Sequence, residues 1–170
     1  MTEHSGDAIA LVRSFIASMT RPPGHSLSQD EIRAAVGRHV RIEIMAASIT
    51  GPAWKTAAPA QRERLCAVLL DLVAKHMAAP FTSEAGSIRV HPLRGGVERR
   101  RVEVPGDKLR ANGSAIKLSW RVDRDRSGPF IYDATCDGVS ILESLRSQFS
   151  EVLRREGVDG LAARLKALPG

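Results

Sequence analysis

The chain has 170 residues, of which 43% are apolar and 26% are charged, which suits one globular domain and excludes a disordered chain. It carries 25 basic and 19 acidic residues for a net charge of +6, and because only five of the basic residues are lysines, 20 are arginines. Arginine binds phosphate in a bidentate fork, so the composition favours a phosphate-bearing partner without choosing among nucleic acids, nucleotides and lipid headgroups. Aromatic residues are only 4% of the chain, which argues against base stacking on an aromatic platform.

The cysteines and the apolar stretches exclude several further classes. Two cysteines, Cys66 and Cys136, are too few for a cysteine-rich zinc module or a disulfide-dense scaffold, and we interpret them as small buried thiols. No run approaches the ~18 apolar residues of a membrane span. Residues 1–7 are polar and do not resemble a signal peptide.

Residues 1–80 are predicted to be mainly helical. Apolar side chains recur at helical spacing in four stretches that proline or glycine separates. Ser28 and Glu31 form a capping box at the start of the second stretch. The fourth stretch begins at Pro59, ends near Pro80 and has the broadest apolar face.

From about residue 88 the apolar period changes to two, which predicts strands. Ile88 and Val90 alternate with polar residues, and Gly95-Gly96 suits a two-residue hairpin turn. The return strand is predicted over 97–104, and two further strands over 116–122 and 130–136. The third strand has one apolar and one polar face, which is typical of an antiparallel sheet.

The order of these elements predicts an α+β fold. Helices in 1–80, an antiparallel sheet in 88–137 and two C-terminal helices in 140–168 form one layered domain over 1–170. We expect a curved sheet of four or five strands packed against the helices, and Gly157 suits the end of the first C-terminal helix. Such layers either pack solid or enclose a cavity, and the sequence leaves both open.

Catalytic and metal-binding patterns are absent. No histidine pair has metal-ligand spacing, and Ser140 lacks a G-x-S-x-G elbow and suits a helix start instead. Asp133 and Asp137 flank the last strand and could act as general bases, although such carboxylates more often cap helices or pair with arginine. We therefore expect no enzyme, no metal and no cofactor.

The densest basic run is Arg99-Arg100-Arg101. Its simplest interpretation is a solvated strand whose charges oppose aggregation. Strict alternation, however, places Arg100 on the same face as Val102 and Val104, where a guanidinium at the rim of an apolar layer could hold an anionic headgroup. Arg100 is therefore a candidate headgroup residue.

Four motifs in order resemble the MlaC, or toluene-tolerance, family of periplasmic lipid-binding proteins in phospholipid-trafficking ABC transport systems. The strongest is YDATCDGVSILESLRSQF at Tyr132–Phe149, which follows the family pattern vyDv-x-x-eGvSlv-x-x-yRsqF. The chain departs from the family at Arg41, where an acidic residue is usual. The remaining matches are Gly51, Trp54, Ala57, Gln61 and Arg62 upstream, Trp120 in the strand 116–122, and Gly157 with Leu161 and Leu165 downstream.

The resemblance implies an NTF2-like arrangement with an apolar cavity that shelters the acyl chains of a phospholipid. It implies a monomeric periplasmic carrier that maintains outer-membrane lipid asymmetry. Its membrane partners would be an inner-membrane ABC transporter with an MCE-type component and an outer-membrane lipoprotein complex. The bound phospholipid is cargo rather than cofactor. The candidate lipid-binding residues are Leu69, Val73, Met77, Val102, Val104, Leu118, Trp120 and Phe149.

Three alternatives stay open at this point. The cargo could be another apolar lipid, such as a hopanoid. The same kind of cavity could belong to an NTF2-like enzyme that uses Asp133 or Asp137 as its base. The basic composition could instead bind RNA or DNA, with an affinity that falls steeply with salt.

Overall fold

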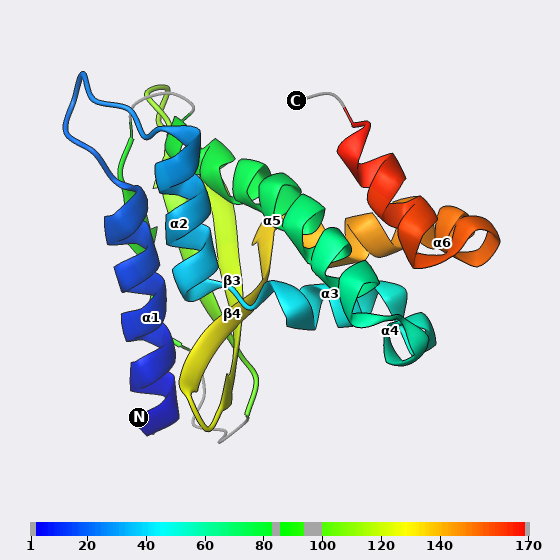
Figure 1. The fold of residues 1–170 in the computed structure, drawn as a ribbon. Coiled ribbons are helices and arrows are strands. Elements are labelled where there is room, and N and C mark those ends of the chain that lie inside the picture. Colours follow the sequence, from blue (N-terminus) through cyan, green and yellow to red (C-terminus); the bar gives the residue numbers. More distant parts are fainter. Residues whose placement is uncertain (1–2, 83–85, 94–99, 169–170) are drawn as a thin grey trace.

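Helices cover an antiparallel sheet of five strands, and the strand order β1-β2-β3-β4-β5 follows the chain (Figure 1). The structure, a computed structural model, describes residues 3–82, 86–93 and 100–168. The helices are α1 (Glu3–Met19), α2 (Gln29–His39), α3 (Ile42–Thr50), α4 (Pro52–Thr56), α5 (Pro59–Thr82) and α6 (Ile141–Lys166). The strands are β1 (Ile88–Val90), β2 (Val102–Leu109), β3 (Ala115–Asp125), β4 (Gly128–Cys136) and β5 (Val139–Ser140). The predicted α+β class and antiparallel sheet are confirmed, and the sheet has five strands.

Helix α5 lies between the helices α1 and α2 on one side and the helices α3 and α6 on the other. Helix α1 lies against strands β1 to β4, and α2 packs between α1 and α5. Helix α5 also packs against α3 and α6, which lie on the other side of it in Figure 1. The most deeply buried side chains come from the sheet and from helices α1, α2, α3, α5 and α6, and include Phe15, Met45, Leu65, Leu69 and Ile131.

Strand β2 differs from its prediction. It begins at Val102 and continues through Pro105 and Gly106 to Leu109, whereas the predicted strand ended at Val104. A Pro-Gly pair is a strong turn signal, which is why the sequence predicted a loop there. Continuous antiparallel pairing with β3 overrides that local preference.

The pairing of β1 also differs from a tight hairpin. The predicted turn at Gly95-Gly96 lies outside the described residues. A two-residue turn there would place Val90 opposite Arg101, but Val90 pairs with Gly106. The connection between β1 and β2 is therefore longer than the sequence predicted.

Strand β4 contains a bulge that turns Asp133 into the protein. Arg121 of β3 pairs with Asp133, whereas the next residue, Val122, pairs with Ile131, so Tyr132 is the extra residue. A bulge re-aims the side chains beside it. Asp133 is consequently fully buried, in a strand whose other buried side chains are apolar.

Asp133 holds the start of α6. Its Oδ1 accepts hydrogen bonds from the backbone N–H groups of Ala134 and Leu142, at 2.9 and 3.0 Å. Its Oδ2 accepts from the Ser140 hydroxyl and, at 3.0 Å, from the Arg121 guanidinium. The prediction that this carboxylate caps a helix and pairs with arginine is confirmed.

Three predicted helix boundaries are confirmed. Ser28 and Glu31 make both hydrogen bonds of a capping box. Ser140 caps α6, because its hydroxyl accepts from the Glu143 backbone N–H at 3.1 Å. Gly157, at φ 70° and ψ −166°, breaks α6 into the two helical runs that the sequence predicted. Only glycine adopts this backbone conformation at little cost.

Helix α5 corrects one sequence expectation. By length and composition it is apolar enough to cross a membrane, although the sequence analysis found no such stretch. A core helix of a globular fold passes the same test. Here α5 packs against α2, α3 and α6 and buries Leu69 and Val73 completely, so we interpret it as the central helix of the fold.

Replacing Asp133 with alanine is expected to lower the free energy of unfolding by about 3–5 kcal/mol, because it removes the buried carboxylate that pairs with Arg121 and leaves the Ser140 hydroxyl and two backbone N–H groups without their acceptor. Urea-induced unfolding followed by circular dichroism measures this loss. The matched control is Asp159→Ala, which removes a surface ion pair with Arg64 and should cost much less. Equal losses in the two variants would contradict a central role for Asp133.

Candidate binding cavity

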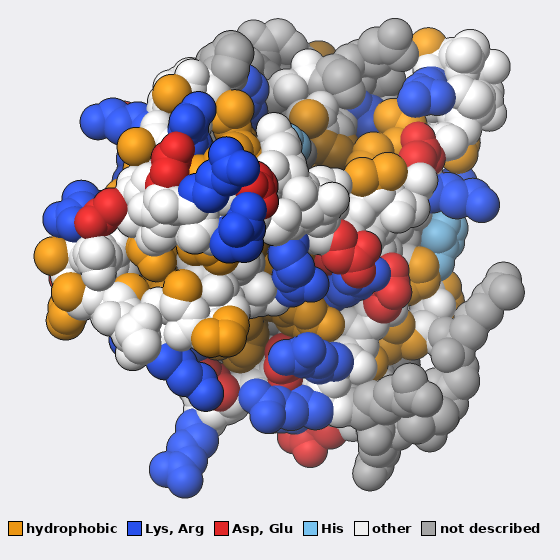
Figure 2. All heavy atoms as spheres, turned by 90° about the vertical axis from the view of Figure 1, so that its right-hand side faces the viewer, with side chains coloured by type: hydrophobic (Ala, Val, Ile, Leu, Met, Phe, Trp, Pro, Cys, Tyr) orange, Lys and Arg blue, Asp and Glu red, His pale blue; other side chains and the backbone are white. Residues whose placement is uncertain are grey.

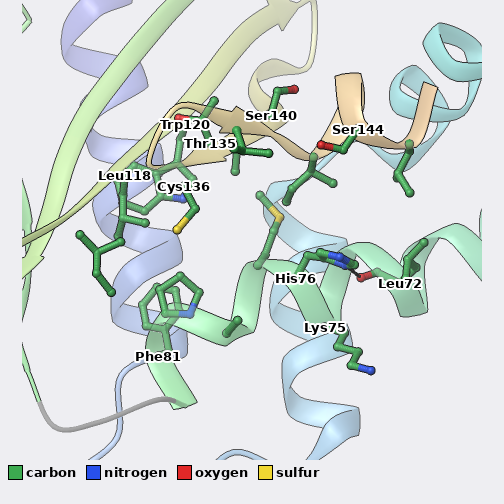
Figure 3. A pocket seen from close by; sticks show the side chains of 18 of the residues that line it. Leu72, Lys75, His76, Phe81, Leu118, Trp120, Thr135, Cys136, Ser140 and Ser144 are labelled. Carbon is green, nitrogen blue, oxygen red and sulfur yellow. Dashed lines mark hydrogen bonds between the residues drawn. The ribbon is translucent and has the colours of Figure 1, made fainter. Parts of the chain in front are cut away.

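A cavity of about 780 Å³ opens between the C-terminal half of α5, strands β3 to β5 and the first turns of α6 (Figure 3). Its volume lies within the roughly 300–1,000 Å³ that is typical of ligand pockets. Most of the surrounding side chains are apolar. The lining residues are Leu72, Lys75, His76, Met77, Ala79, Pro80, Phe81, Ile116, Leu118, Trp120, Ala134, Thr135, Cys136, Val139, Ser140, Ile141, Ser144, Leu145, Gln148 and Leu168.

The periodicity of each element explains how it contributes to the wall. Ile116, Leu118 and Trp120 are spaced by two and therefore share one face of β3. On α5, Leu72 and His76 are one helical turn apart, as Ser144 and Gln148 are on α6. Helices α5 and α6 pack against each other, and the cavity lies between the two helices and the sheet.

Trp120 is fixed in the wall by a glycine behind it. Gly106 on the neighbouring strand β2 is buried, and a Cβ there would lie 2.5 Å from the Arg89 carbonyl oxygen and 2.8 Å from the Trp120 ring. Both distances are too short for any side chain. Gly106 therefore leaves room for the Trp120 ring and the Arg89 backbone, and any larger residue would force one of them to move.

Exposure divides the lining into a floor and a mouth. Met77, Leu118, Trp120 and Leu145 are buried and form an apolar floor. The mouth has one apolar edge, where Val139 is 62% exposed. A second edge is polar, with the exposed side chains of Lys75, His76, Ser144 and Gln148.

The ionisable side chains that line the mouth include basic but no acidic ones among the described residues. None of the lining residues that the structure describes is an aspartate or a glutamate, whereas Lys75 and His76 can both carry positive charge. The His76 Nδ1 lies 2.8 Å from the Leu72 carbonyl oxygen. Because a carbonyl only accepts, the hydrogen sits on Nδ1, and Nε2 is the nitrogen left for a ligand.

The structure places three of the eight candidate lipid-binding residues in the cavity wall: Met77, Leu118 and Trp120. The other five lie outside the lining. Leu69, Val73, Val104 and Phe149 are buried in the core, and Val102 is partly buried against it. Their apolar pattern is the same as that of the wall residues, so the sequence could not separate the two groups.

Arg100, the candidate headgroup residue, lies beyond the opposite end of the sheet. It precedes Val102, which pairs with Val122, whereas the cavity begins at Trp120 and continues toward Ile116. Its Nε donates to Asp123 Oδ1 at 2.7 Å. The position of Arg100 therefore gives its headgroup role no support.

The two carboxylates considered as bases are also outside the lining. Both oxygens of Asp133 accept several hydrogen bonds, as described above. Asp137 lies in the turn before β5, where its Oδ1 accepts from the Lys117 backbone N–H at 3.0 Å. Neither carboxylate is among the lining residues, so neither is placed to act as a base on a molecule in the cavity.

The sequence analysis named none of the four residues at the polar edge of the mouth as binding candidates. Lys75 and His76 occupy the solvent side of an amphipathic helix in the sequence, and nothing in their spacing marks them. Gln148 matches the family pattern of the motif 132–149, but nothing in the sequence marked it as part of a cavity, and Ser144 lies at a variable position of the same pattern. Only the divergence of α5 from α6 brings these four side chains to one opening.

A second groove borders the cavity on the far side of α5. It lies between α2, α5 and the end of α6 and shares Leu72, Lys75 and Leu168 with the cavity. Two ion pairs lie along this groove, Arg33–Asp71 and Arg64–Asp159, each with an N···O distance of 2.9 Å. This groove is accordingly much more polar than the cavity.

The arginines are spread over the surface. Figure 2 shows basic side chains interleaved with acidic and apolar ones on the face that it presents. Twelve of the described arginines contact at least one carboxylate in the same molecule, and these are Arg21, Arg33, Arg41, Arg64, Arg89, Arg100, Arg101, Arg121, Arg124, Arg154, Arg155 and Arg164. This pairing does not favour the basic stripe expected of a nucleic-acid-binding protein.

The cysteines and the metal-ligand residues give no further site. Cys66 and Cys136 are both free, but Cys66 is only partly buried and Cys136 is exposed at the cavity, so the interpretation of both as buried thiols was wrong. The described residues contain no group of three or more histidine, cysteine, aspartate or glutamate side chains that could hold a metal ion.

The fold has a solved counterpart. A phospholipid-binding protein from Ralstonia solanacearum, whose structure holds a phospholipid, superposes on this chain with a TM-score of 0.78. The two are 20% identical, and the match covers 96% of this chain and 95% of the other. This likeness shows that the two proteins share an α+β fold.

The family follows from the sequence itself. The family model described as MlaC protein matches residues 12–167. That range is nearly the whole chain. The protein belongs to the MlaC family.

Gly106→Ala is expected to lower the free energy of unfolding by about 1–3 kcal/mol, because the added methyl group displaces the Trp120 ring or the Arg89 backbone. Thermal or urea unfolding followed by Trp fluorescence measures it. The matched control is Gly37→Ala in α2, where a Cβ meets nothing within 4 Å and alanine favours the helix. A Gly106 variant as stable as the Gly37 variant would show that the ring is not held this tightly.

Proposed function

We propose that the protein is a soluble lipid carrier that shelters the acyl chains of a phospholipid in the cavity between α5, α6 and the sheet. The observation that carries the proposal is the apolar cavity with one open mouth in a chain of the MlaC family. The phospholipid in the similar Ralstonia protein supports this choice of cargo. The MlaC family consists of carriers rather than enzymes.

The energetics of the cavity suit a shuttle. Burying a methylene group is worth about 0.8 kcal/mol, so two chains of ~15 methylenes are worth on the order of 24 kcal/mol relative to water. A bilayer offers nearly the same free energy, so transfer between membrane and cavity is close to neutral. Release into water is negligible, and handover therefore requires contact with a membrane-bound partner.

The partners and the compartment follow from the family. We propose that the carrier works in the periplasm, between an inner-membrane ABC transporter with an MCE-type component and an outer-membrane lipoprotein complex. The exposed Val139 at the apolar edge of the mouth suits contact with such a partner during handover. The direction of transport would be set by the partners, since the cavity itself stores no energy.

Filling the cavity is expected to abolish most of the lipid binding. Ala79 lines the cavity and is exposed, so Ala79→Trp places an indole where the chains would lie without a clash in the core. Native mass spectrometry of protein loaded from detergent-solubilised phospholipid should show occupancy well below half of the wild-type value. The matched control, Ala10→Trp, changes an exposed residue of α1 outside the lining and should load normally.

Bound lipid is expected to protect Cys136 from alkylation. Cys136 is exposed and lines the cavity, so its reaction with iodoacetamide should slow severalfold in loaded protein. Cys66 lies outside the lining, and burial raises the pKa of its thiol to about 11, so about one thiol in a thousand is ionised at pH 8. Cys66 should react slowly whether or not lipid is bound, and faster as the pH rises toward 11.

Single-cysteine variants separate the two rates. Cys66→Ser reports Cys136 alone, and Cys136→Ser reports Cys66 alone, each followed by mass spectrometry. Equal alkylation of Cys136 in loaded and empty protein would place the cargo elsewhere.

A further inference from the structure

The polar groups of the cavity are gathered at one edge of its mouth. Lys75, His76, Ser144 and Gln148 are all exposed, whereas the floor contains Met77 and other buried apolar side chains. In the view of Figure 3, Lys75, His76 and Ser144 lie to one side, and Leu118 and Trp120 to the other. This gradient matches a ligand whose polar end stays near water while its apolar part is buried.

The sign of the charge at this edge is positive. Lys75 and His76 are consecutive on α5, and no described lining residue carries a carboxylate. The two neutral side chains that α6 contributes, Ser144 and Gln148, can each donate a hydrogen bond as well. A ligand group held here would therefore be an anion that accepts hydrogen bonds.

The His76 ring is oriented for such a ligand. Its Nδ1–H donates to the Leu72 carbonyl oxygen, one helical turn earlier, which fixes the ring on the cavity side of α5. The other nitrogen, Nε2, has no partner among the described residues. When the imidazole is protonated, Nε2–H becomes a second donor, directed to whatever occupies the mouth.

We propose that Lys75 and His76 bind the phosphodiester of the cargo lipid, so that the cavity selects two-chain phospholipids over neutral lipids of similar apolar volume. The inference rests on the proposed carrier function and deepens it. Charge-assisted hydrogen bonds at a partly hydrated mouth give about tenfold or greater preference for a lipid with a phosphodiester. Because both groups are exposed, that preference falls as the salt concentration rises.

The test is a competition between three lipids with the same dioleoyl chains. Protein is loaded from detergent micelles that hold equal amounts of phosphatidylglycerol, phosphatidylethanolamine and diacylglycerol, and the bound lipids are counted by native mass spectrometry. Wild-type protein should take each phospholipid at least about tenfold over diacylglycerol. The Lys75→Ala/His76→Gln variant should bring these ratios close to one.

A matched control removes the same two kinds of side chain elsewhere. Lys55 in α4 and His25 in the α1–α2 loop are exposed and lie outside the cavity lining. Lys55→Ala/His25→Gln makes the same change of charge and should keep the wild-type preference. Circular dichroism of both double variants verifies the fold, and the single variant His76→Gln should show an intermediate preference.

The outcomes separate this inference from the carrier function. Equal loading of all three lipids by the wild-type protein, or an unchanged preference in the Lys75/His76 variant, overturns the phosphodiester site and leaves the carrier intact. Failure of every lipid to load overturns the carrier function itself. Added inorganic phosphate should not displace phospholipid, and displacement would show a site for free phosphate instead.

Discussion

The buried carboxylate of Asp133 connects the sheet to the helix that forms one wall of the cavity. It accepts hydrogen bonds from the backbone of its own strand, from Arg121 on the neighbouring strand, and from Ser140 and Leu142 at the start of α6. A buried charge is tolerated only when its hydrogen-bonding capacity is filled in this way. The direction in which α6 leaves the sheet is therefore fixed, and with it the gap between α6 and α5.

The cavity exists because α5 changes its surroundings along its length. In its first half, Leu65 and Leu69 are buried completely where the helix packs against α2, α3 and α6. In its second half, Leu72, His76 and Ala79 face the opening between the sheet and the start of α6. The same helix therefore packs into the solid core with its first half and lines the cavity with its second half.

The predictions from the sequence succeeded where a local signal fixes the structure. The capping box at Ser28, the helix start at Ser140 and the break at Gly157 depend on the conformation of a few neighbouring residues, and all three are confirmed. The strand through Pro105 and Gly106 was missed because its local turn signal is overridden by pairing with β3. The candidate lipid-binding residues differ in their surroundings: Met77, Leu118 and Trp120 line the cavity, whereas Leu69 and Val73, on the same apolar stripe of α5, lie in the core.

The sequence by itself determined the class of fold, the positions of most helices and strands and the family, because these depend on periodicity, capping and motifs that are local along the chain. Only the tertiary structure decided which apolar residues enclose a space rather than fill one. That distinction depends on the bulge that buries Asp133 and on the angle between α5 and α6, which are set by contacts between distant residues. The excess of arginine, which the composition connects with a phosphate-bearing partner, is largely paired on the surface. The positive charge at the cavity mouth comes instead from a lysine and a histidine that no pattern in the sequence singles out.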